Sequence, residues 1–218
     1  MFFSLPISKV PQCLLALGFL LGTCSAGAHS LADQTVFPEI EAAPTCELIL
    51  PNAGEYAYAQ LPARQVQLQQ NTTLPPMTQT WSINCSAPTT VLFKVTDLQR
   101  DTTSGQDTTQ FGLGYVNGAG EIGYFRLDLS HATVDSQITR LYQTQDQQQL
   151  GVLTNQLTVE NDQFYGWATD ENRAAIGSLF TMDMTVTPTL NSLQETQGPL
   201  VSGAELAGNV SLSFQFGI

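Results

Sequence analysis

The sequence predicts an all-β sandwich of about eight to ten strands. Several segments alternate strictly between apolar and polar residues, and glycine- and proline-rich turns separate them. No segment sustains the 3.6-residue period of a helix, apart from a candidate turn near residues 170–175. Faces of this kind are stable when they pack against a second sheet, and 218 residues are compatible with one such domain.

The first 28 residues have the features of a secretory leader. Lys9 precedes an apolar run over residues 13–21, and residues 26–28 (Ala-Gly-Ala) suit signal peptidase. The run is shorter than the roughly 20 residues that span a bilayer, which disfavours a membrane anchor. Lipidation at Cys24 is a further alternative, although Thr23 fits that signal badly. We therefore expect a signal peptide over residues 1–28 and an exported mature chain of about 190 residues.

The charge balance bears on partners. The chain has 7 basic and 19 acidic residues, and Lys9 leaves with the leader. Without a basic patch to neutralise phosphates, nucleic acid is not an expected partner.

Leader cleavage leaves two cysteines, Cys46 and Cys85. An even pair in an exported protein predicts a disulfide, with two buried free thiols as the disfavoured alternative. No histidine lies near them in the sequence, so we expect no zinc site, and nothing else in the chain indicates a cofactor.

Three segments have the clearest strand pattern. Residues 77–85 and 180–186 alternate large apolar residues with threonine and other polar residues, and residues 210–218 place Val, Leu, Phe, Phe and Ile on one face. Burial of these last five side chains is worth about 7 to 15 kcal/mol, at about 1.5 to 3 kcal/mol each. We therefore expect another β-segment to cover this final strand.

The middle of the chain predicts a hairpin and two loops. Residues 111–115 and 122–129 flank a turn at residues 117–120, whose glycines serve turns because no Gly-Lys-Ser/Thr ending and no helix follow. The polar stretch 97–110 reads as a loop in which Asp97, Asp101 and Asp107 are solvated carboxylates, since their spacing does not suit calcium. The glutamine-rich residues 143–149 predict a solvated loop or an edge strand.

Candidate functional side chains are few. Tyr165 and Trp167 belong to an aromatic cluster that is either core, which we favour, or a sugar-stacking surface. A triad of Ser130, His131 and Asp128 is disfavoured because neighbours on a strand alternate faces. The chain also lacks the Gly-x-Ser-x-Gly and His-Glu-x-x-His motifs. The sequence therefore predicts a non-enzymatic protein.

A set of local motifs resembles, in its order, a fimbrial-like domain family of unknown function from Gram-negative bacteria that is related to chaperone–usher pilins. The motifs lie at residues 46–48 (CEL), 81–88 (WSINCSAP), 97–100 (DLQR), 111–114 (FGLG), 122–124 (IGY) and 208–214 (GNVSLSF). The resemblance covers most of residues 36–218.

The resemblance implies an immunoglobulin-like, pilin-type sandwich over residues 46–218 that lacks its last strand. In such pilins a periplasmic chaperone lends a strand, an outer-membrane usher assembles the fibre, and the N-terminal arm of the next subunit replaces the chaperone, so the resemblance implies these partners here. The receiving groove is then lined by Val210, Leu212, Phe214 and Phe216. The donor arm lies within residues 29–45, with Leu31, Val36 and Ile40 as its apolar residues, although composition alone favours a tail there.

Two departures from that family stand out. Pilins carry an aromatic residue next to last, whereas Gly217 and Ile218 follow Phe216 here. Pro38 removes one backbone donor from the arm. These features leave open a polymerising subunit, a cap, a minor subunit or a protein that no longer assembles. The alternative function is a self-complete secreted sandwich that binds a carbohydrate or another surface ligand through Tyr165 and Trp167.

Overall fold

Two antiparallel sheets contain about half of the residues described by the computed structural model, which are 43–58, 66–103, 105–147, 149–200 and 205–217. The larger sheet has the strand order β1-β3-β15-β8-β12, with β2 paired to β15, and β5 and β9 paired to β8. Its strands are β1 (Cys46–Ile49), β2 (Thr72–Thr73), β3 (Met77–Thr89), β5 (Phe111–Gly112), β8 (Gly123–Val134), β9 (Gln137–Ile138), β12 (Gln156–Thr158) and β15 (Gly177–Leu190).

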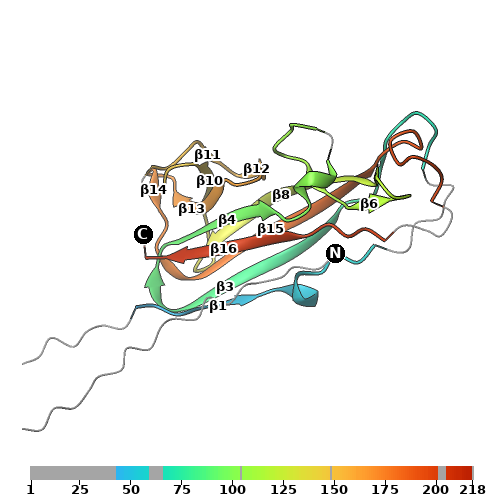
Figure 1. Ribbon diagram of the computed structural model, residues 1–218. Coiled ribbons are helices and arrows are strands. Elements are labelled where there is room, and N and C mark those ends of the chain that lie inside the picture. Colours follow the sequence, from blue (N-terminus) through green and yellow to red (C-terminus); the bar gives the residue numbers. More distant parts are fainter. Residues whose placement is uncertain (1–42, 59–65, 104, 148, 201–204, 218) are drawn as a thin grey trace, which may run out of the picture. The chain divides into compact units, whose positions relative to one another are not determined.

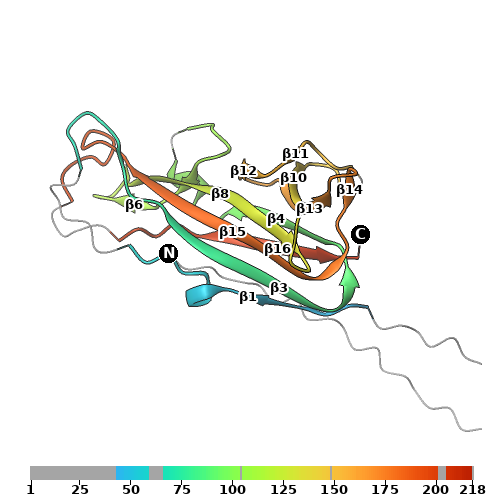
Figure 2. The ribbon, with the colours of Figure 1, turned by 180° about the vertical axis from the view of Figure 1, so that it is seen from behind.

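The smaller sheet has the order β11-β10-β13-β4-β16, with β14 paired to β13. Its strands are β4 (Val91–Asp97), β10 (Arg140–Thr144), β11 (Leu153–Thr154), β13 (Phe164–Thr169), β14 (Arg173–Ala174) and β16 (Val210–Phe216). The pair β6 (Tyr115–Val116) and β7 (Gly120–Glu121) forms a separate ribbon, and two 3₁₀ turns, η1 (Pro51–Gly54) and η3 (Arg100–Thr102), complete the described elements. Figures 1 and 2 show the two sheets from opposite sides.

The inner faces of the two sheets form one core. Trp167 of the smaller sheet is 1% exposed, and its ring centroid lies 5.4 Å from that of Phe180 in the larger sheet. Its indole Nε1 donates a 3.0 Å hydrogen bond to the Thr181 carbonyl oxygen across the layers. The predicted all-β sandwich is therefore confirmed, with more strands than expected because many are ladders of two or three residues.

The alternation of apolar residues predicted the long strands correctly. Residues 77–85, 180–186 and 210–216 lie in β3, β15 and β16 respectively, with the large side chains of the first two turned to the core. The predicted hairpin is also present, because residues 111–112 (β5) pair with residues 124–125 of β8, and β6 pairs with β7 nearer the turn. Asn117 and Gly118 in that turn have φ angles of 51° and 93°.

The dipeptide Ala87-Pro88, which by its sequence would end a strand in a turn, lies inside β3, because β3 continues through both residues to Thr89. Pro88 is tolerated there because the ladder between β3 and β15 is irregular between Asn84 and Thr89. Only Thr90 then separates β3 in the larger sheet from β4 in the smaller one. The chain therefore changes sheets almost without a loop.

Candidate functional site

The C-terminal strand β16 lies at one edge of the smaller sheet. It pairs antiparallel with β4 over its whole length, from Val210 opposite Asp97 to Phe216 opposite Val91. No other strand of the described residues pairs with its second edge. One side of β16 therefore faces away from the sheet.

The register determines which backbone groups lie on that side. The Leu98 N–H donates to the Asn209 carbonyl oxygen, and the Gly217 N–H donates to the Thr90 carbonyl oxygen. Hydrogen-bonded pairs recur at every second residue of an antiparallel ladder, so the odd-numbered residues of β16 bond to β4. The N–H and C=O groups of Val210, Leu212, Phe214 and Phe216 point to the free edge.

The apolar side chains of β16 become more exposed toward its C-terminal end. Val210 and Leu212 are 1% and 4% exposed, Phe214 is half-buried, and Phe216 is 38% exposed. Phe214 packs on Phe93 of β4, with ring centroids 5.6 Å apart, and Phe216 stacks 6.3 Å from Phe214. The expected groove lining is therefore only partly accessible, because Val210 and Leu212 already belong to the core.

The edge strand of the other sheet lies on the same side of the sandwich. In Figures 1 and 2 the larger sheet runs upward from β1 to β12 and the smaller one upward from β16 to β11, so β1 and β16 are the lower edges of their own sheets in both views. Among the described strands, β1 pairs only with β3. Two strand edges, one from each sheet, therefore border this side.

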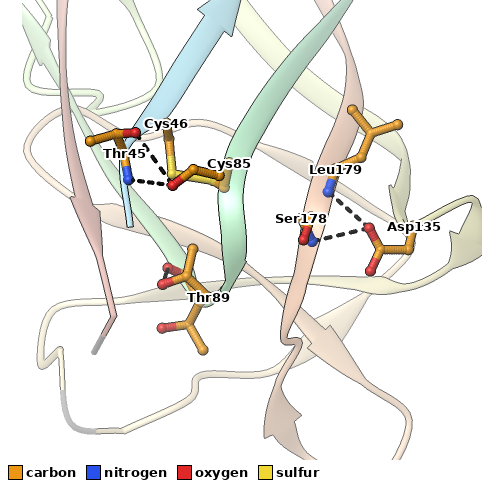
Figure 3. Close-up of a disulfide and its surroundings, with 9 residues drawn as sticks. Thr45, Cys46, Cys85, Thr89, Asp135, Ser178 and Leu179 are labelled. Carbon is orange, nitrogen blue, oxygen red and sulfur yellow. Dashed lines mark hydrogen bonds between the residues drawn. A yellow bond between two sulfur atoms is a disulfide. The ribbon is translucent and has the colours of Figure 1, made fainter. Parts of the chain in front are cut away.

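The predicted disulfide is confirmed and fastens β1. Cys46 and Cys85 are directly opposite in the ladder of β1 and β3, and their sulfur atoms are 2.11 Å apart (Figure 3). Next to them the Thr45 N–H donates a 3.0 Å hydrogen bond to Ser86 Oγ, and the Ser86 N–H donates to the Thr45 carbonyl oxygen. The bridge and these two bonds hold the first strand of the sandwich.

Near the disulfide, the Asp135 side chain holds two backbone N–H groups of β15. Its carboxylate oxygen Oδ1 accepts hydrogen bonds from the backbone N–H groups of Ser178 (3.0 Å) and Leu179 (2.8 Å), as Figure 3 shows. The β3–β15 ladder shifts register between Gly177 and Leu179, so Asp135 satisfies donors at that irregularity. Its role is structural.

Two members of the disfavoured triad, Ser130 and His131, lie closer together than the alternation of side chains along a strand predicts. His131 has a φ of 49° at a bulge in the β8–β15 ladder, so it shares the outer face with Ser130. Its Nδ1 atom lies 3.2 Å from Ser130 Oγ and 3.0 Å from Asp183 Oδ2. A proton relay needs the serine and the carboxylate on different ring nitrogens, so this arrangement does not form one. Asp128 instead accepts a hydrogen bond from Thr158.

The candidate sugar-stacking residues are buried. Tyr165 is 0% exposed and Trp167 is 1% exposed, and both rings pack against Phe93, at 5.6 and 5.8 Å between centroids. The Tyr165 hydroxyl donates to the Glu160 carbonyl oxygen. Neither ring presents a face to a ligand, so the structure contradicts their assignment as binding residues and supports the core assignment.

The prediction for Asp97 is also wrong, since this carboxylate is only 6% exposed. It is not solvated because two backbone donors replace water: the Gln99 N–H at 2.8 Å and the Gly112 N–H at 2.9 Å. Burial raises the pKa of the Asp97 carboxyl above its ordinary value, and the two N–H groups oppose that rise. Asp97 thus joins the end of β4 to the next loop and to β5.

No metal site was predicted, and the described part of the chain contains no group of three or more His, Cys, Asp or Glu side chains placed to hold an ion. Among the same residues, no helix is long and apolar enough to cross a membrane. The predicted signal peptide and the arm residues Leu31, Val36 and Ile40 lie outside the described residues.

The free edge of β16 could not be assigned to a strand-binding site by similarity. Comparisons with protein-family models, with curated proteins and with solved structures found no match. The candidate site therefore depends on the geometry of β16, β4 and β1 alone.

Proposed function

We propose that this chain is an exported, non-enzymatic subunit of a surface fimbria, completed by a β-segment that another protein supplies along β16. The observation that carries the proposal is the free edge, where four alternate residues of β16 direct their N–H and C=O groups away from β4. An added strand would satisfy these groups and cover Phe216, the most exposed apolar side chain of β16.

The partners follow from the resemblance to chaperone–usher pilins. A periplasmic chaperone supplies the strand first, an outer-membrane usher directs assembly, and the N-terminal arm of another subunit takes the chaperone's place. Alternate apolar side chains of the incoming strand would pack beside Phe214 and Phe216, while its backbone forms the ladder.

Pro38 determines how we rank the possible positions in the fibre. A proline in the donor arm removes one N–H from the ladder, which weakens donation by this chain without affecting its ability to receive a strand. The chain is therefore better suited to receive a strand than to donate one. A chain that receives a strand can be a cap or a minor subunit as well as a repeating subunit of the fibre.

The test is co-expression of the full chain with a pilus-type periplasmic chaperone, followed by affinity purification of the chaperone. We expect the chain to be unstable alone and to be recovered in a complex. Phe214→Asp and Phe216→Asp should abolish recovery, because each puts a carboxylate among apolar groups at the edge. Ser213→Asp is the matched control, since this exposed side chain lies on the same strand at a position whose backbone bonds to β4.

Phe214 is half-buried, so the Phe214→Asp variant also weakens the fold. Phe216 is 38% exposed, so the Phe216→Asp variant separates the loss of strand addition from the loss of stability. Recovery of the Phe216→Asp variant at the level of the Ser213→Asp control would contradict the proposal. So would a wild-type chain whose recovery and stability are the same with and without the chaperone.

A further inference from the structure

An open hollow of about 560 Å³ lies beside the loop between β10 and β11, a volume in the range of small-molecule sites. Four glutamine side chains line it: Gln143, Gln145, Gln149 and Gln163. Within the described part of the chain, none of these amide groups takes part in a hydrogen bond. Each amide has two donor hydrogens and an acceptor oxygen available to a ligand.

The frame of the hollow is fixed by its own contacts. The Thr144 hydroxyl donates to the Asp146 carbonyl oxygen at 2.7 Å, and the Gln149 N–H donates to the same oxygen at 3.1 Å, which closes a turn. A Cβ atom at Gly151 would lie 1.8 Å from the Gln143 carbonyl oxygen, so the loop returns against β10 as only glycine allows. Leu150 anchors the loop on a small second apolar cluster outside the main core.

The chemistry of the lining restricts the ligand. None of the described lining residues is positively charged, so an anionic ligand finds no counter-charge, and Asp146 adds a carboxylate at the rim. The apolar side chains of Leu150, Val152 and Leu157 supply non-polar surface beside the amides, and Val152 is 87% exposed. Paired donors and acceptors next to apolar surface match a neutral ring that carries hydroxyl groups on its edge and C–H groups on its face.

We propose that this hollow binds a neutral carbohydrate. A peptide is less well matched, because the neighbouring edge strand β11 has only two residues and offers too short a ladder for an added strand. The lining contains no aromatic side chain, so stacking does not contribute and the binding is weak, with Kd in the millimolar range.

The position of the hollow makes it independent of strand addition. It lies at the β10–β11 end of the smaller sheet, whereas β16 forms the opposite edge. A strand added along β16 would leave it open. A subunit in a fibre would therefore present a ligand site on its side, and a self-complete protein would present the same site.

The test uses the full ¹⁵N-labelled chain in the form in which it purifies, titrated with maltose, lactose and N,N′-diacetylchitobiose. We expect at least one sugar to shift the side-chain amide signals of the hollow. The double variant Gln145→Ala/Gln149→Ala should weaken that binding about fivefold or more, through two lost hydrogen bonds. Gln137→Ala, an exposed glutamine on β9, is the matched control and should bind as the wild type does.

The proposal is overturned if none of the three sugars shifts these signals, or if sialyllactose or a neutral tripeptide binds at least as tightly. Equal binding by the double variant and the Gln137→Ala control would also overturn it. The double variant Gln145→Ala/Gln149→Ala keeps this test apart from the previous one, because it changes the hollow and leaves β16 intact, so the chaperone should capture it as it captures the wild type. Absence of sugar binding by a wild-type chain that the chaperone captures would refute only the carbohydrate site.

Discussion

Amide hydrogen exchange along β16 should alternate from residue to residue. The N–H groups of residues 211, 213 and 215 bond to β4, whereas those of residues 212, 214 and 216 face the free edge. Exchange of the first set requires β16 to detach, which exposes the buried side chains of Val210 and Leu212. At about 1.5 to 3 kcal/mol each, detachment costs about 3 to 6 kcal/mol.

That cost corresponds to exchange roughly 10² to 10⁴ times slower for the odd-numbered residues than for the even-numbered ones, at about 1.4 kcal/mol per factor of ten. The measurement is hydrogen exchange by NMR on the full chain, with and without a captured chaperone. Capture should slow the even-numbered amides to the rate of their neighbours. Equal protection of both sets in the chain alone would refute the reasoning, because the edge would then already be covered.

Three further outcomes test the fold. Replacing Cys46 and Cys85 together by alanine should lower the free energy of unfolding by roughly 4 kcal/mol, the loop-entropy estimate for the 39-residue separation, as urea denaturation would measure; a loss below about 1 kcal/mol would contradict it. Trp167→Ala should cost about 3 to 5 kcal/mol by the same assay, whereas an exposed sugar-stacking residue would change stability by less than about 0.5 kcal/mol. Burial raises the pKa of Tyr58 to about 12, so its folded phenol keeps a proton that the unfolded one loses above pH 10. Stability should therefore be independent of this group below pH 10 and fall as pH rises toward 12, by at most about 1.4 kcal/mol per unit, a slope that Tyr58→Phe should reduce.

The sequence was most informative where a strand buries one face, because side-chain alternation follows directly from the pleat. Residues 77–85 and 180–186 and the cysteine pair were predictable for that reason. The two- and three-residue strands were not, because they depend on register with distant partners. The burial of Asp97 depends on such a partner as well, since Gly112 supplies one of its donors.

The candidate sites also differ in how much of each could be predicted from the sequence. The alternating residues of β16 were visible in the sequence, but the direction of its free N–H groups follows from the β4 register, which was not. The shared face of Ser130 and His131 results from a bulge, and a histidine with positive φ has no sequence signal here. The glutamine-lined hollow was anticipated only as a polar loop, because its shape depends on the close approach of Gly151 to Gln143.

The single-residue passage from β3 to β4 at Thr90 has a mechanical consequence. Traction along β16 would load its hydrogen bonds to β4 in shear, so that the whole ladder resists together. Because no flexible loop separates β4 from β3, the force would pass directly into β3 and on to the disulfide at Cys85. Strand β16 is thus coupled by a short, stiff route to β3 and, through the disulfide, to β1, the first of the described strands.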